Sequence, residues 1–219
     1  MSAVARTATV AALEAAGIVA VIRLKDAGKL RGVVDALVEG GVRALEVTMT
    51  VPGAVELIRA IKPTLPDGFL LGAGTVTDAA TATRVIDAGA SFVVSPVFRR
   101  DVLSEAHRHD VAALPGCFTP TEILDAWEAG ADIVKVFPAT ALGPTFFKDV
   151  RGPLPHVKLM PTGGVTIDNV GTWIAAGAVA VGIGTSLLDA AAIAAGDFAT
   201  IAANARRTVE NVARARKAE

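Results

Sequence analysis

One lysine stands inside a short apolar segment, Asp132-Ile-Val-Lys-Val-Phe-Pro-Ala139. A segment that is apolar on both sides is typical of a buried strand in a parallel sheet. Burial penalises the ammonium form, so it lowers the pKa of a lysine, and a neutral amine can attack a ketone to form a Schiff base. Lys135 is therefore a candidate nucleophile. The alternative is a structural lysine whose stem is buried and whose charge reaches solvent.

A carboxylate in another expected strand is the natural partner for this lysine. In Ala44-Leu-Glu-Val-Thr-Met49, alternation places Glu46 and Thr48 on one face, and Lys135 shares a face with Phe137. If both faces line the interior of a barrel, the two groups can meet there. The pair suits a nucleophile with a general acid/base, and it also suits a plain buried ion pair.

Two late loops have the composition of an anion-binding site. Thr162-Gly163-Gly164 and Gly184-Thr185-Ser186 leave backbone N–H groups uncovered by side chains and add hydroxyl donors. Loops after the last two strands of a barrel often bind phosphate. Tight turns that need glycine conformations explain either loop alone. Because both loops share this composition, we expect a phosphorylated ligand.

The elements that must position these groups alternate between strands and helices. Strands are predicted at residues 17–23, 44–49, 69–73, 91–95, 111–114, 133–137, 157–160 and 178–183. Helices are predicted at residues 7–16, 26–38, 55–61, 78–88, 101–108, 121–129, 145–150, 167–176 and 197–216. This alternation predicts an α/β fold, a (β/α)8 TIM barrel with additional N- and C-terminal helices, as one domain over residues 1–219. We expect the first helix to cover one end of the barrel.

Functional groups of such barrels lie at the C-terminal ends of the strands. The residues that the sequence places at or near those ends include Arg23, Thr75, Pro96 and Phe137. A dinucleotide fold is not supported, because neither G-x-G segment completes G-x-G-x-x-G or follows the first strand.

Other reactive side chains have simpler explanations. Lys158 lies near the N-terminal end of its strand, the end associated with stability, so we interpret it as structural. Cys117 is expected to be a small buried residue. We expect His107 and His109 to be solvated on a surface helix.

Composition excludes several classes of protein. The net charge is −1 and there is no basic stripe, which argues against a nucleic-acid partner. No run approaches the roughly 18 apolar residues that a membrane span needs, and no signal peptide is evident. A single cysteine and three scattered histidines favour a cytoplasmic protein without a metal site.

The chain resembles the class I aldolases that cleave 2-keto-3-deoxy-6-phosphogluconate (KDPG), many of which also act on 4-hydroxy-2-oxoglutarate. The resemblance covers roughly residues 17–190. It rests on these segments: Gly41-Val-Arg-Ala-Leu-Glu-Val-Thr48, Gly72-Ala-Gly-Thr-Val76, Lys135-Val-Phe-Pro-Ala139, Arg151-Gly-Pro-Leu-Pro155, Pro161-Thr-Gly-Gly-Val165 and Gly182-Ile-Gly184. Each segment is weak alone, and together they are specific.

The resemblance implies that Lys135 forms the Schiff base, that Glu46 is the general acid/base, and that Thr75 and Thr162 hold the pyruvyl part of the substrate. It also implies a homotrimer, and no cofactor beyond the covalent imine. Substrate contacts are predicted at Arg23, Thr50, Thr75, Pro96, Phe137 and Thr162. Phosphate contacts are predicted at Gly163, Gly164, Gly184, Thr185 and Ser186.

The sequence departs from one branch of this family just after Glu46. That branch reads Glu-Val-Thr-Leu-Arg-Thr and uses the arginine on the substrate carboxylate, whereas Thr50 stands at that position here. We hypothesise that Arg23 takes the carboxylate instead, because its planar fork of donors suits that group.

Three alternatives remain open at the level of sequence. The substrate could be the galactonate epimer or 4-hydroxy-2-oxoglutarate. The protein could be a phosphosugar isomerase or epimerase that needs no imine. It could also be a non-enzymatic trimeric scaffold with a relic site.

Overall fold

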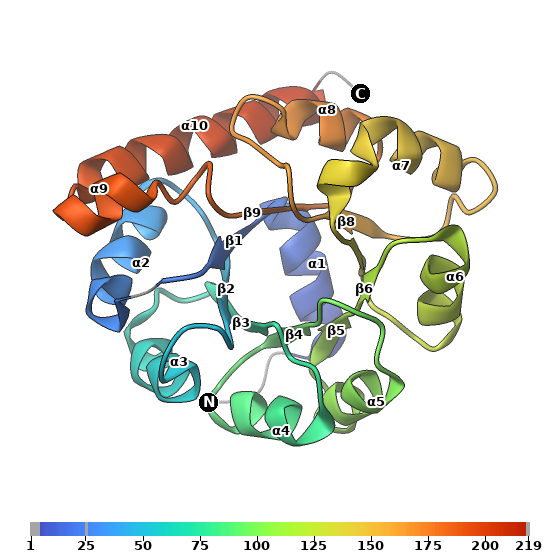
Figure 1. Cartoon of the computed structure of the whole chain (residues 1–219), viewed down its shortest axis with the longest axis horizontal. Helices are drawn as coiled ribbons and strands as arrows, with labels where there is room; N and C mark the ends of the chain where they lie inside the picture. Colours follow the sequence, from blue (N-terminus) through green and yellow to red (C-terminus); the bar gives the residue numbers. More distant parts are fainter. Residues whose placement is uncertain (1–4, 25, 218–219) are drawn as a thin grey trace.

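The computed structural model describes residues 5–24 and 26–217. The prediction of one domain over residues 1–219 also covers residues outside these ranges. The strands, drawn in Figure 1, are β1 (Ile18–Ile22), β2 (Ala44–Thr48), β3 (Leu70–Gly74), β4 (Phe92–Val94), β5 (Ala112–Leu114), β6 (Gly116–Cys117), β7 (Val134–Val136), β8 (Leu159–Pro161) and β9 (Val181–Ile183).

These strands form a closed parallel barrel. Six of them pair in the order β5-β4-β3-β2-β1-β9, and three pair in the order β6-β7-β8. A bridge between Thr162 and Gly182 joins β8 to β9, and β5 continues into β6 through Pro115. The predicted α/β barrel is confirmed, with one difference. Its fifth strand is divided, because proline has no N–H to donate to the ladder.

In the view of Figure 1, α1 lies over the middle of the barrel and the other helices lie around it. They are α1 (Arg6–Ala16), α2 (Leu30–Glu39), α3 (Ala54–Ile61), α4 (Ala79–Asp87), α5 (Arg100–Arg108), α6 (Pro120–Glu128), α7 (Gly143–Arg151), α8 (Val170–Ala175), α9 (Ala190–Ala195) and α10 (Phe198–Lys217), with 3-10 turns η1 (Ala27–Lys29), η2 (Lys62–Thr64) and η3 (Ala139–Ala141). The helix predicted at residues 26–38 is divided into η1 and α2. The prediction missed α9, because a run of alanines with a single isoleucine has no apolar periodicity.

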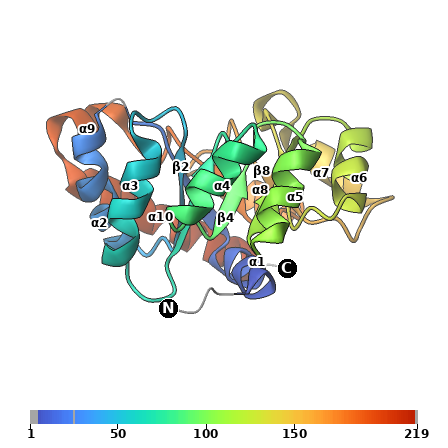
Figure 2. The ribbon, with the colours of Figure 1, turned by 90° about the horizontal axis from the view of Figure 1, so that it is seen from below.

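Alternation along the strands separates two apolar clusters. Val19, Leu70 and Phe92 point inward and pack with Leu13 of α1, while the neighbouring strand residues pack outward against the helices. The first helix therefore closes one end of the barrel, as predicted. Figure 2 shows α1 at the lower edge of the molecule, away from α9, which lies near the top.

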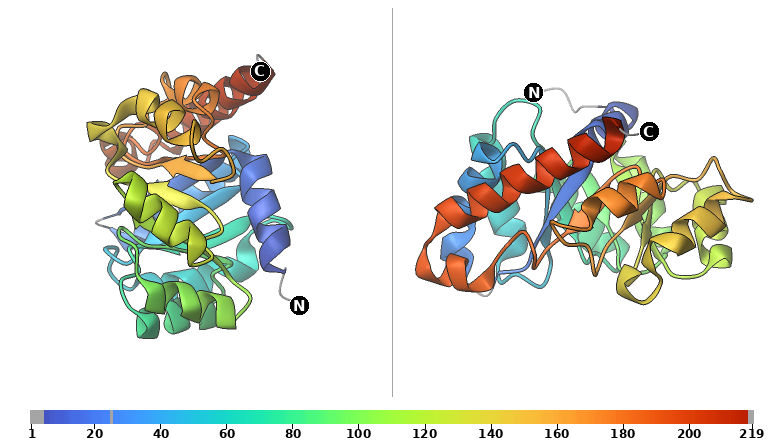
Figure 3. Two further views of the ribbon diagram at one scale, coloured as in Figure 1. Left: turned by 90° about the vertical axis from the view of Figure 1, so that its right-hand side faces the viewer. Right: turned by 90° about the horizontal axis from the view of Figure 1, so that it is seen from above.

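The C-terminal helix secures α1 in this position. The guanidinium of Arg216 in α10 donates to the carbonyl oxygens of Ala15 (2.8 Å), Glu14 and Val179 (3.2 Å). The first two belong to the last turn of α1, whose carbonyls have no partner inside the helix. Figure 3 shows the end of α10 beside α1.

We therefore expect Arg216→Met to lower the free energy of unfolding by about 1–3 kcal/mol, because it removes charged hydrogen bonds and keeps the apolar stem. Urea unfolding measures the change. Arg214→Met is the matched control on the same turn of α10, where the side chain is exposed, and should shift stability by less than about 0.5 kcal/mol. Equal effects of the two changes would contradict the proposed anchoring of α1.

Candidate active site

Lys135 and Glu46 lie inside the barrel on strands separated in the sequence. Lys135 is in β7, opposite Gly116 of β6 and Met160 of β8, and Glu46 is in β2, opposite Val21 of β1. Only 2% of Lys135 and 1% of Glu46 is exposed. The interpretation of Lys135 as a lysine whose charge reaches solvent is therefore excluded.

Burial is the largest influence on the pKa of both groups. Loss of solvent lowers the pKa of Lys135, and this outweighs the carboxyl of Glu46, which raises it; the charge of Arg23 lowers it further. Loss of solvent also raises the pKa of Glu46, against the opposing effects of Lys135 and Arg23. The site thus favours a neutral amine beside a protonated carboxyl, which are the forms that a nucleophile and a general acid require.

The two groups do not form a hydrogen-bonded ion pair. Both carboxyl oxygens of Glu46 are buried without a hydrogen-bond partner. Lys135 Nζ lies 5.0 Å from the centre of the Phe137 ring, two residues along the chain. A buried carboxyl without a protein partner is free to bond a ligand or a water.

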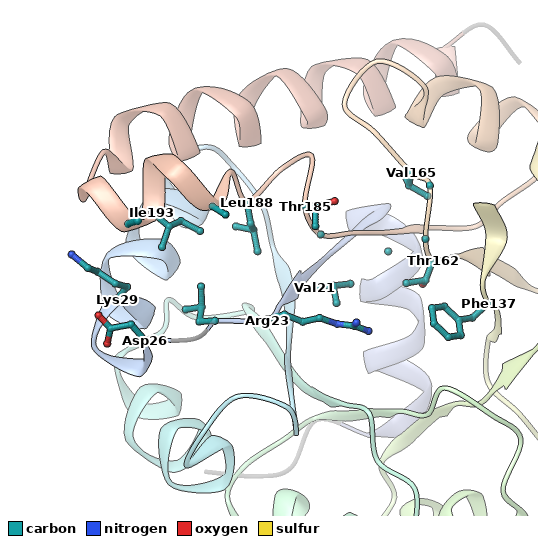
Figure 4. Close-up of a pocket in the computed structure, with 17 residues that line it drawn as sticks. Val21, Arg23, Asp26, Lys29, Phe137, Thr162, Val165, Thr185, Leu188 and Ile193 are labelled. Carbon is teal, nitrogen blue, oxygen red and sulfur yellow. The ribbon is translucent and has the colours of Figure 1, made fainter. Parts of the chain in front are cut away.

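A cavity of about 670 Å³ opens at the C-terminal ends of β1, β7, β8 and β9 (Figure 4). Lys135 and Glu46 do not line it themselves, but Phe137, whose ring lies 5.0 Å from Lys135 Nζ, does. Arg23 points across it towards Phe137 and Thr162 in Figure 4. Thr162 is 6% exposed, and its hydroxyl has no hydrogen-bond partner. This volume is typical of a small-molecule site.

The glycine loops border the same cavity. Gly163, Gly164, Gly184 and Thr185 line it. Gly163 and Gly164 have φ of 90° and 74°, a conformation that side chains rarely adopt, so glycine is required there. The Ser186 hydroxyl accepts the backbone N–H of Ile167 at 3.1 Å, which ties the loop after β9 to the loop after β8.

Four predicted contact residues do not line the cavity: Thr50, Thr75, Pro96 and Ser186. The first three follow β2, β3 and β4, on the other side of the barrel mouth. The Thr50 hydroxyl lies 2.6 Å from the Thr48 hydroxyl, which donates to the carbonyl of Ile22. Thr50 is thus part of a hydrogen-bond chain to the end of β1, a role that its position in the sequence did not indicate.

Part of the cavity wall was not predicted from the sequence. This part is mainly apolar and comes from the residues after β1 and from the region of α9. It comprises Leu24, Asp26, Lys29, Leu188, Ala190, Ile193 and Ala194. A barrel prediction contains no signal for these positions, because α9 lies outside the repeating unit.

The other reactive side chains have structural partners. Lys158 forms an ion pair with Glu14 of α1, as expected of a structural lysine. Burial raises the pKa of the Cys117 thiol to about 12, which keeps it inert. His107 and His109 are not simply solvated as predicted; they lie 3.1 Å from Asp132 and Glu105 respectively.

Residues 5–24 and 26–217 contain neither a metal-binding cluster nor a membrane-spanning helix. No group of three or more histidine, cysteine, aspartate or glutamate side chains in these ranges is arranged to hold a metal ion. Within the same part of the chain, none of the helices combines the length and the hydrophobicity needed to span a bilayer.

Comparisons with known proteins show the family to which the chain belongs. Residues 10–204 match the family described as "Aldolase: KDPG and KHG aldolase". The 2-dehydro-3-deoxy-phosphogluconate aldolase of Treponema pallidum is 37% identical over 202 residues, which are 92% of this chain and 96% of the relative. A probable 2-dehydro-3-deoxy-6-phosphogalactonate aldolase of Rhizobium meliloti is 36% identical over 171 residues, which are 78% of this chain and 81% of that relative.

A solved structure matches nearly the whole fold. It is the KDPG aldolase of Legionella pneumophila with pyruvate captured at low pH as a covalent carbinolamine intermediate. Its TM-score to this chain is 0.84, at 29% identity, over 91% of this chain and 97% of that one.

Proposed function

Because the chain belongs to the KDPG and KHG aldolase family, we propose that it cleaves 2-keto-3-deoxy-6-phosphogluconate to pyruvate and glyceraldehyde 3-phosphate through an imine on Lys135. It is thus a carbon–carbon lyase. The observation that supports the imine best is the burial of Lys135, which lowers the pKa of its amine. A KDPG aldolase relative of the same fold has been captured with pyruvate as a covalent carbinolamine, which also supports covalent chemistry.

The reaction begins when the neutral amine of Lys135 attacks the C2 ketone. Glu46 shuttles protons, directly or through a water, while the carbinolamine forms and loses water to give an iminium. Its carboxyl is buried without a partner and carries a raised pKa, so it can donate a proton in this step.

Cleavage follows when a base removes the proton of the C4 hydroxyl. The C3–C4 bond breaks, its electron pair moves into the iminium to give an enamine, and the C4 oxygen becomes the aldehyde of glyceraldehyde 3-phosphate. Protonation of the enamine at C3 and hydrolysis of the imine release pyruvate and free Lys135. The electrons balance within the substrate, so the scheme needs neither a metal nor an organic cofactor.

The phosphate end of the substrate is assigned to the glycine loops. Gly163, Gly164, Gly184 and Thr185 border the cavity, where backbone N–H groups and a hydroxyl can donate to phosphate oxygens. Thr162 has a free hydroxyl between these loops and Phe137, which suits a contact with the keto-acid part.

The activity is tested by measuring pyruvate release from three substrates: the gluconate compound, its galactonate epimer, and 4-hydroxy-2-oxoglutarate. We expect the highest kcat/KM with the gluconate compound and measurable cleavage of 4-hydroxy-2-oxoglutarate. A higher value for the galactonate epimer would reassign the substrate. No pyruvate from any of the three, with interconversion of phosphosugars, would favour an isomerase.

Arg23 is the proposed partner of the substrate carboxylate. Replacing Arg23 with Ala should raise the half-saturating pyruvate concentration for borohydride trapping roughly 10- to 100-fold, because a charged hydrogen bond is lost. Pyruvate carries no phosphate, so this readout isolates the carboxylate. Lys29→Ala is the matched control, since Lys29 is the other cation that lines the cavity within the described residues. Equal shifts in the two variants would exclude a specific role for Arg23.

The assembly and location of the enzyme are further parts of the proposal. We expect a homotrimer in the cytoplasm, acting on small phosphorylated keto acids without nucleic-acid or membrane partners. Light scattering of the purified protein distinguishes a trimer from a monomer.

A further inference from the structure

No hydrogen bond from the residues that the structure describes holds the carboxyl of Glu46 in place. Neither of its oxygens has a hydrogen-bond partner, and the side chain is 1% exposed. The neighbouring strand β3 provides the space for it. A Cβ atom added to Gly74 would lie 2.3 Å from Glu46 Oε1 and 2.7 Å from Cδ, far inside normal contact distances.

Gly74 is not required by its own backbone conformation. It is not among the glycines with positive φ, it pairs with Thr48 in regular parallel register, and its carbonyl accepts the N–H of Met49 at 2.8 Å. A glycine in a regular strand weakens the strand and commonly marks a close approach by another group. The group that approaches here is the Glu46 carboxyl.

A second glycine in the same barrel also lies close to a buried polar side chain. A Cβ on Gly182 of β9 would lie 2.4 Å from the hydroxyl of Thr162, another buried polar group without a partner. Gly182 also lacks a positive φ. In both pairs, a glycine on one strand makes room for an unpartnered polar side chain from a neighbouring strand.

From these contacts we propose that Gly74 is a positioning residue, which holds the Glu46 carboxyl in a notch on β3 and thereby keeps it buried and apart from the Lys135 amine. The inference rests on the proposed function, since it concerns the acid/base group of that reaction. The position of the Glu46 carboxyl is therefore set by the space left where Gly74 has no side chain, and not by a hydrogen bond.

Alanine at position 74 removes this notch. The Glu46 carboxyl must then move off β3 towards the cavity, where it meets solvent and approaches Lys135. The charged groups that face it are Lys135 from β7 and Arg23 at the end of β1, and both favour the ionised carboxylate. Greater exposure reduces the desolvation that raises the pKa of Glu46, so its pKa should fall in Gly74→Ala.

The direct test is the titration of Glu46 by carbon NMR of the glutamate side chains in wild type and Gly74→Ala, with Glu46→Gln used to assign the signal. This readout does not depend on catalysis, so it is informative even if the proposed function fails. We expect a lower pKa in Gly74→Ala than in wild type, because the carboxyl is less desolvated. An unchanged titration would overturn the proposal.

Kinetics supply the second test. We expect Gly74→Ala to lower kcat roughly 10- to 100-fold, the scale of a displacement of about 1 Å in an active site, and to change KM less than about threefold. The matched control is Gly171→Ala in α8, where an added Cβ meets only Ala215 at 3.6 Å. Its kcat should equal that of wild type. Wild-type kcat in Gly74→Ala would contradict the proposal.

A double variant keeps the test valid if Gly74→Ala folds poorly. Glu46→Asp shortens the side chain by one methylene and withdraws the carboxyl from the notch. Gly74→Ala should therefore reduce kcat and thermal stability much less in the Glu46→Asp background than alone. Equal losses in both backgrounds would show that the alanine acts elsewhere.

Discussion

We expect Lys135→Met to abolish aldol cleavage and to give a more stable protein. Without the amine there is no imine and no electron sink, so kcat/KM falls by at least ~10⁴-fold, the scale on which removal of a nucleophile acts. Burial disfavours the charged form of Lys135, so substituting an apolar side chain of similar length should raise the free energy of unfolding at neutral pH. Loss of activity with gain of stability separates a catalytic lysine from a structural one.

The stability gained in Lys135→Met should increase as the pH falls. The pKa of Lys135 is lowered in the fold, so the lysine binds fewer protons in the folded than in the unfolded chain. Its contribution is therefore most favourable above the usual lysine pKa of 10.5 and is lost as the pH falls through the lowered folded pKa. The stabilisation by methionine should be small above pH 10.5 and should grow as the pH falls. Urea unfolding at several pH values measures it.

Lys158→Met is the control for this experiment. Lys158 is also a strand-associated lysine, but its side chain is 38% exposed and pairs with Glu14 at the other end of the barrel. Its replacement should leave kcat unchanged. A protein that loses activity on Lys158→Met and keeps it on Lys135→Met would overturn the assignment of the nucleophile.

We expect Glu46→Gln to lower kcat by roughly 10²- to 10⁴-fold, the usual contribution of a general acid/base. The amide preserves the shape of the carboxyl but transfers no proton, so carbinolamine formation and dehydration both slow. Lys135 remains, so pyruvate is still trapped by borohydride, only more slowly. This slow trapping distinguishes Glu46→Gln from Lys135→Met.

The pH profile of kcat/KM gives the control for Glu46. The raised pKa of Glu46 places its ionisation above the ordinary 4.5 of a glutamate, and the limb of the profile that reports it should disappear in Glu46→Gln. Glu46→Asp retains a carboxyl and should retain a limb, with a reduced kcat. An identical pH profile in wild type and Glu46→Gln would exclude Glu46 as the proton shuttle.

The sequence was sufficient to predict the barrel and its central pair, because both depend on alternation along strands. Once the strands are recognised, the alternation of side chains between the two faces of a strand predicts that Lys135 and Glu46 point into the barrel. The apolar neighbours of Lys135 predict that it is buried. The tight turns at Gly163 and Gly164 were also predictable, since glycine is the residue that most readily adopts the positive φ found there.

Features that depend on tertiary packing could not be predicted in this way. The α9 helix has no apolar period, so the apolar side of the cavity was missed. The substrate contact predicted at Thr50 stays a prediction, and the hydrogen bond between its hydroxyl and that of Thr48 was not foreseen. The role of Gly74 depends on a side chain 28 residues earlier in the chain, which no local pattern reveals.

The imine on Lys135 is tested most directly by incubating the protein with pyruvate and sodium borohydride, then measuring intact mass and mapping the modified peptide. A stable pyruvyl adduct on Lys135, absent from Lys135→Met and present in Lys158→Met, is the predicted result. No adduct, or an adduct confined to Lys158, would contradict the imine mechanism and favour an isomerase or a non-enzymatic scaffold.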